Sequence, residues 1–196
     1  MTDNTSMSAA NLQLDLPTWC DPFLAQRGEH FNSTTKRMQL ALALAQQNIE
    51  HRGGPFGAAV FDQQGRLLSI GMNLVSPAKC SILHAEVVAL VLAEQQLHSY
   101  DLSLHGKQHL ELVTSCEPCT MCLGAVIWSG VHRLTCGARD EDARAIGFDE
   151  GPKPKHAFAE LEHRGIHVER DVLRHEAVAI LQAYQHSGQP IYNPGQ

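Results

Sequence analysis

The sequence lacks any long apolar run: none approaches the roughly 20 residues that a membrane-spanning helix needs. Residues 1–17 also lack the basic segment and the apolar segment of a secretory signal. These absences favour a protein of the reducing cytoplasm without a membrane partner. In that compartment the six cysteines are expected to be thiols or metal ligands rather than disulfides.

A basic patch is missing as well. Lysine and arginine together number 15, they form no run, and the formal net charge is −6. A protein that grips a nucleic-acid backbone usually presents a basic face, because phosphate contacts dominate its affinity. The charge balance therefore favours a small polar substrate over a polynucleotide.

What is present is an ordinary globular composition, with 43% hydrophobic and 18% charged residues in a chain of 196. That length suits a single domain with one core. We expect an N-terminal arm at residues 1–31, a folded domain at 32–187 and a tail at 188–196. The sequence contains no internal repeat and no low-complexity segment.

Segments with helical periodicity alternate with short apolar segments typical of strands, which predicts an α/β fold with helices covering a sheet. The expected helices span about 34–49, 84–97, 118–128, 156–163 and 175–186. The expected strands span about 56–61, 67–72, 110–114, 133–137 and 166–173. The first two strands flank Asp62-Gln-Gln-Gly65, a hairpin signal, and segments 73–83 and 138–154 are expected to be loops.

Residues 115–122, SCEPCTMC, contain three cysteines. Cys119 and Cys122 are three residues apart at a predicted helix start, so they share one helix face. The helix N-terminus favours thiolate, which is the form that binds metal. A lone pair of this kind is also typical of a redox dithiol. Cys116 is expected to be buried, and Glu117 has no predicted role.

A zinc site needs further ligands, and catalytic zinc has three protein ligands and a water. Among 12 histidines, His84 is the best placed, since it opens an apolar helix and Glu86 follows two residues later. A carboxylate beside a metal-bound water can carry its proton. Alone, His84 or Glu86 would be an ordinary helix-start residue. The combination of HAE and PCxxC at two helix starts is far more specific.

These two motifs resemble the zinc signature of the cytidine/deoxycytidylate deaminase superfamily, over roughly residues 32–150. The resemblance implies a three-layer α-β-α sandwich with a mixed sheet of about five strands. It also implies one zinc ion per chain, held by His84, Cys119 and Cys122, with Glu86 as proton shuttle.

Within this superfamily, the stretches GGPFGA (53–58), TSCEPCTMCLGA (114–125) and GFDE (147–150) look like those of bacterial guanine deaminases. By that resemblance Glu150 is the second acid that contacts the base, although the family residue is aspartate. Asn73 matches the family's base-contacting asparagine.

The same resemblance implies further substrate contacts at Phe56, Trp128 and Ala85 and in the tail at Tyr192. Guanine deaminases resemble one another in being homodimers whose C-terminal segments can exchange and close over the site. Deletion of residues 188–196 would test that lid.

The implied reaction is hydrolysis of guanine to xanthine and ammonia. Zinc-bound hydroxide would attack C2, Glu86 would move a proton toward ring N3, and Glu150 would bind the N1–H and 2-amino edge. Three alternatives stay open: a tRNA adenosine deaminase, a deaminase of another amino-heterocycle such as an aminotriazine, and a non-catalytic zinc scaffold. An acidic balance without a basic C-terminal helix disfavours the first. Glu86 beside an open zinc position disfavours the last, because a structural site would normally have a fourth Cys or His.

Overall fold

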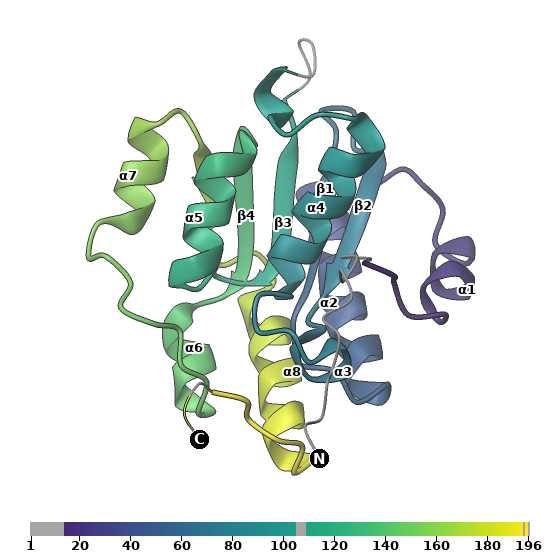
Figure 1. Cartoon of the computed structure of the whole chain (residues 1–196), viewed down its shortest axis with the longest axis vertical. Helices are drawn as coiled ribbons and strands as arrows, with labels where there is room; N and C mark the ends of the chain where they lie inside the picture. The colour runs from purple at the N-terminus through teal and green to yellow at the C-terminus, as the bar shows by residue number, and fades with distance from the viewer. Residues whose placement is uncertain (1–13, 105–108, 194, 196) are drawn as a thin grey trace, which may run out of the picture.

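The computed structural model describes residues 14–104, 109–193 and 195. Five strands form one mixed sheet in the order β2-β1-β3-β4-β5 (Figure 1). They span Gly57–Phe61 (β1), Leu67–Met72 (β2), Glu111–Cys116 (β3), Arg133–Ala138 (β4) and His167–Glu169 (β5). β1 pairs antiparallel with both β2 and β3, whereas β3, β4 and β5 are parallel. The predicted mixed five-stranded sheet is confirmed.

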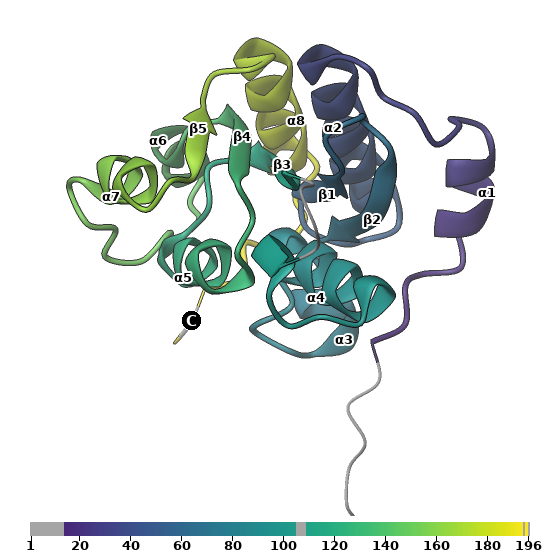
Figure 2. The same ribbon diagram turned by 90° about the horizontal axis from the view of Figure 1, so that it is seen from above.

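Helices cover both faces of this sheet, as the view from above shows (Figure 2). One face carries α2 (Thr34–Glu50) and α8 (Arg174–His186), with the short α6 (Asp140–Ala145) beside α8. The other face carries α4 (Ala85–Leu97), α5 (Thr120–Ser129) and α7 (Ala157–His163). Each face has its own apolar cluster, so the sheet separates two cores in the predicted α-β-α sandwich.

The β1–β2 hairpin forms where the sequence predicts it. Asp62 Oδ1 accepts hydrogen bonds of 2.9 Å from the main-chain N–H groups of Gln64 and Arg66. Gly65 has φ of 79°, which a glycine adopts without strain. Both features close the tight turn.

The close packing of α4 on β2 depends on Gly71. A Cβ atom at this position would collide with the main-chain oxygen of Ala85. Without a side chain at Gly71, the first turn of α4 lies directly against the sheet. This contact places His84 and Glu86 at one end of β1 and β2.

Three segments differ from expectation. Segment 73–83 contains a single helical turn, α3 (Val75–Ala78), and β5 is shorter than predicted. The acidic segment after β4 begins with α6 instead of a loop. Arg139 N–H donates to Asp142 at 2.7 Å, and Arg174 of α8 binds Asp142 at 2.9 Å, so tertiary contacts stabilise this short helix.

The part of the predicted arm that the structure describes contains α1 (Cys20–Ala25), and residues 1–13 lie outside the described residues. Trp19 stacks on His51 with ring centroids 5.2 Å apart, and the N–H of Leu67 donates to Glu29 O at 2.8 Å. These contacts attach the arm to α2 and β2. No helix within the described ranges is long and apolar enough to cross a membrane.

Candidate active site

A cavity of about 580 Å³ opens beyond the carboxyl ends of β3 and β4, where parallel strands commonly present functional loops. Its walls come from the starts of α4 and α5, the loop after β2, the segment after α6 and the C-terminal tail. The lining side chains include Phe56, Asn73, His84, Glu86, Cys116, Glu117, Cys119, Thr120, Phe148, Glu150 and Tyr192.

His84, Cys119 and Cys122 lie at this cavity with ligand atoms all within 4.8 Å of one another. His84 Nδ1 is 3.5 Å from Cys119 Sγ. Tetrahedral zinc with ordinary Zn–N and Zn–S bonds would hold two such atoms about 3.6 Å apart. One imidazole and two thiols therefore fit zinc, and a set of three leaves a fourth position for water or substrate. Cys80 is not a member of this group.

The surroundings of the thiols favour metal binding. The pKa of Cys119 is lowered to about 4, chiefly by a hydrogen bond from Cys122 and also by one from His84. The pKa of Cys122 moves the other way, because it donates that hydrogen bond and is buried. Burial would lower the pKa of His84, but the hydrogen bond with Cys119 and nearby negative charges raise it. The pKa of each of these three side chains is therefore affected by at least one of the other two.

Glu86 lies beside these ligands with 6% of its surface exposed. Burial, and then the negative charge of Cys119, raise its pKa to about 7. A carboxyl group with a pKa near neutrality can both accept and release a proton, as a shuttle must.

Glu150 brings a second buried acid into the cavity from a different segment, with 7% of its surface exposed. Burial, followed by the charges of Cys119 and Glu86, raises its pKa to about 8. Its main-chain oxygen accepts two hydrogen bonds from Thr120, at 3.0 Å from the N–H and 3.1 Å from the hydroxyl. Because Thr120 lies between the two cysteines, these bonds fix the main chain of Glu150 relative to the ligand group.

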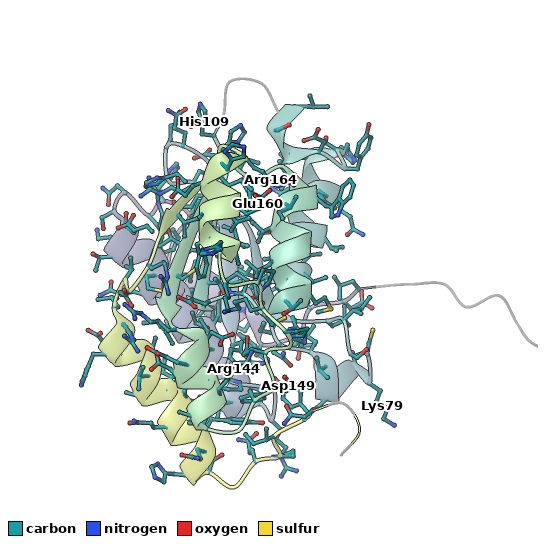
Figure 3. The ribbon with its side chains drawn as sticks, turned by 90° about the vertical axis from the view of Figure 1, so that its left-hand side faces the viewer. Lys79, His109, Arg144, Asp149, Glu160 and Arg164 are labelled. Carbon is teal, nitrogen blue, oxygen red and sulfur yellow. The ribbon has the colours of Figure 1, made fainter. Side chains whose placement is uncertain are left out.

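Arg144 holds the same segment from the other side. It donates to Gly151 O at 2.7 Å and to Asp140 at 2.7 Å. Asp149, which precedes Glu150, has a side chain that is 57% exposed, and its Oδ1 lies 3.8 Å from a guanidinium nitrogen of Arg144 (Figure 3). Glu150 therefore belongs to an anchored segment, although it follows a glycine-containing turn.

Asn73 and Phe56 also line the cavity. Asn73 is 1% exposed, and its Oδ1 accepts the N–H of Val75 at 3.2 Å. Phe56 packs edge-on against Phe148, with ring centroids 5.0 Å apart. An amide and two aromatic rings suit a flat polar ring.

The described part of the tail covers this cavity in its own chain. Tyr192 packs against Phe148 with ring centroids 5.1 Å apart, and its buried hydroxyl has no hydrogen-bond partner among the described residues. Asn193 donates to Gly147 O and accepts from the N–H of Asp149, both at 2.9 Å. The tail thus contacts the segment that carries Glu150.

Two expected contact residues lie elsewhere in this chain. Trp128 is 84% exposed and does not line the cavity. It follows the buried Val126 by two residues, about 200° around α5, and so points away from the core. Ala85 is fully buried, with its carbonyl against Gly71, and it does not line the cavity either. Neither residue therefore lines the cavity of its own chain, and a contact of either one with substrate stays a prediction.

Sequence reasoning missed Glu117, which is 4% exposed. Its carboxylate accepts hydrogen bonds from Arg170 at 2.6 Å and from the N–H of Asp140 at 3.1 Å. Lys153 lies 3.8 Å from it and 2.8 Å from the carboxylate of Asp140. These contacts hold the turn just before the cysteines. The sequence contains no signal for them beyond an acid beside Pro118.

Comparison with known proteins places this site in a family. The model of the cytidine and deoxycytidylate deaminase zinc-binding region matches residues 32–138, more than half of the chain. The chain therefore belongs to the cytidine/deoxycytidylate deaminase family of zinc-dependent hydrolases.

Among its relatives, the structure of a guanine deaminase from Nitrosomonas europaea is 45% identical, covers 92% of this chain and 100% of its own, and superposes with a TM-score of 0.85. The guanine deaminase of Bacillus subtilis is 39% identical over 98 residues, which are 50% of this chain and 59% of that relative's length. A tRNA-specific adenosine deaminase from Buchnera aphidicola is 31% identical over 74% of this chain and 88% of its own.

Proposed function

We propose that this protein deaminates guanine hydrolytically to xanthine and ammonia. The supporting observation is that Glu150, a second buried acid, lines the same cavity as Asn73 and Glu86. The likeness to a guanine deaminase along nearly the whole chain agrees with this proposal.

The residue roles follow from their chemistry. His84, Cys119 and Cys122 would hold zinc, which when bound acidifies a coordinated water. Glu86 would accept that proton and pass it to the ring, since it adjoins the ligands and its pKa lies near neutrality. Glu150 would bind the N1–H and 2-amino edge and protonate the departing amine.

The remaining walls suit a small base. Asn73 would donate or accept one hydrogen bond, and Phe56 would contact the ring. Tyr192 would close the site, because the tail covers the cavity. A cavity of about 580 Å³ and the net charge of −6 favour a free base over a tRNA stem-loop.

Ammonia release from a substrate panel tests the proposal. The panel contains guanine, adenine, cytosine, cytidine, deoxycytidylate, aminotriazines and a tRNA anticodon stem-loop. Turnover of guanine with xanthine as product is expected. Activity confined to the stem-loop would refute the proposal. Activity on another heterocycle alone would refute guanine as the substrate and identify that heterocycle in its place.

Three wider assignments accompany the proposal. A cytoplasmic location agrees with six free cysteines, and a role in purine catabolism follows from the reaction. A homodimer agrees with Trp128 and Met121 of α5, which expose large apolar side chains. Exchange of the tails between subunits stays a prediction, which a structure of the assembled protein would test.

A further inference from the structure

Asn48 lies in the last turn of α2 and does not line the cavity, yet it is bonded to two of the cavity's walls. It is 1% exposed. Its side-chain nitrogen donates two hydrogen bonds of 2.9 Å, to the main-chain oxygens of Gly54 and Asn73. One amide group thus uses both of its hydrogens on two loops that lie 19 residues apart in the sequence.

Those two loops carry Phe56 and Asn73, which line the cavity. Gly54 precedes Phe56 on the loop into β1, and Asn73 follows β2 directly. The loops are also bonded to each other, because the N–H of Asn73 donates to Phe56 O at 3.1 Å. Gly53 lets the first loop come this close, since a Cβ there would collide with the Asn48 amide.

These bonds determine which atom of Asn73 is available to a ligand. Its N–H is bonded to Phe56, its carbonyl to Asn48, and its Oδ1 to the N–H of Val75. With the main-chain N–H occupied, the side-chain nitrogen is the donor that Asn73 can offer to an acceptor on the base. Loss of the hydrogen bond from Asn48 would let the main chain of Asn73 move. The side-chain nitrogen of Asn73 would then no longer be held in one direction.

We propose that Asn48 is a positioning residue for base recognition, acting through Asn73. The chemistry requires an asparagine: aspartate has no hydrogens to donate when ionised, and an apolar residue of similar size would leave both carbonyls without partners. This inference rests on the proposed function, because it assigns Asn73 to the bound base.

A double-mutant cycle tests the inference with Asn48→Ala, Asn73→Ala and the combined variant, measured as kcat/KM with zinc content and melting temperature alongside. Asn48→Ala is expected to lower kcat/KM about 100-fold, because small misplacements of a binding group have effects of this size. In the Asn73→Ala background the same change should cost less than about 3-fold, since coupled residues are not additive. The melting temperature should fall equally in both backgrounds.

Ser69→Ala is the matched control. Ser69 is buried and donates a side-chain hydrogen bond of 2.7 Å to the main-chain oxygen of Ala89, away from the cavity. It should lower the melting temperature and leave kcat/KM within about 2-fold, as expected for loss of a distant hydrogen bond. If Asn48→Ala does not fold, Asn48→Ser, which keeps one donor, replaces it in the cycle.

An equal loss of kcat/KM in both backgrounds would overturn the proposal, and so would wild-type kcat/KM in the Asn48 variant. The cycle uses whichever heterocycle the wild-type protein deaminates in the substrate panel. Failure on guanine would therefore refute the proposed function, whereas additivity on the true substrate would refute the role of Asn48.

Discussion

Replacement of Glu150 by glutamine is the sharpest test of the proposed chemistry. Glutamine has nearly the same shape, and Thr120 holds the main chain of this residue by two hydrogen bonds that do not involve its side chain. The substitution therefore removes the acid from a cavity wall that keeps its position. Zinc content and melting temperature should stay at wild-type values.

The expected loss has two parts. General acid–base catalysis by one positioned group typically contributes 10²- to 10⁴-fold, so kcat should fall by about that factor. A hydrogen bond between neutral groups contributes about 0.5–1.5 kcal/mol, which corresponds to a rise in KM of roughly 2- to 13-fold. The assay follows loss of guanine and appearance of xanthine at saturating and limiting substrate.

Asp149→Asn is the matched control, because Asp149 is the neighbouring acid and also borders the cavity, but its side chain is 57% exposed and lies 3.8 Å from Arg144. Asparagine keeps an oxygen that can accept the N–H of Gly151, as Asp149 Oδ1 does at 2.9 Å. Its kcat/KM should stay within about 3-fold of wild type, as expected for an exposed ion pair. A Glu150→Gln enzyme with kcat within tenfold of wild type would exclude Glu150 from proton transfer.

The remaining predictions concern zinc, the tail and acid stability. Chelation should abolish activity and lower the melting temperature, zinc should restore both, and Cys122→Ser should bind less than one equivalent of metal; full activity in metal-free protein would refute the site. Deletion of residues 188–196, which removes Tyr192, should raise KM and lower kcat at unchanged zinc content, and unchanged constants would exclude a lid. Hydrogen bonding by Arg174 lowers the pKa of Asp142, so this pair stabilises the fold above the ordinary aspartate range and loses that effect as pH falls through the lowered pKa. Asp142→Asn should therefore unfold at lower urea concentration at pH 7, with a difference from wild type that disappears in acid; an equal difference at every pH would refute the linkage.

The elements that positioned the zinc group were predictable because their signals are local. Apolar periodicity located α2 and α4, and the hairpin turn at Asp62 located β1 and β2. His84 and the two cysteines stood at the starts of predicted helices, so the sequence already brought ligands to element ends. The resemblance to a known fold supplied the mixed sheet of about five strands, whereas the strand order was seen only in the structure.

Other features depend on contacts between distant segments. α6 has six residues and is stabilised by Arg174 from α8, so no window of sequence contains its cause. Glu117 is bonded to Arg170, 53 residues later, and looked like a surface acid in isolation. The exposed position of Trp128 depends on the rotation of α5 about its axis, which a resemblance of motifs does not report.

The zinc ligands depend on local sequence signals, whereas the residues proposed to select the substrate depend on contacts between distant segments. The zinc half arises from two short motifs at helix starts, and this chain is similar both to a guanine deaminase and to a tRNA-specific adenosine deaminase. The half that we propose to recognise the base is held by Thr120 on Glu150, by Asn48 on the Asn73 loop and by Asn193 on the segment after α6. Each of these contacts joins residues 25 or more positions apart and uses a main-chain atom at one or both ends. We therefore expect that changes in these supporting residues can alter substrate preference while the metal ligands stay the same. Variants at Asn48 and Thr120 should accordingly alter the ratio of guanine to adenine turnover at constant zinc content, and an unchanged ratio in both would place selectivity in the contacting side chains alone.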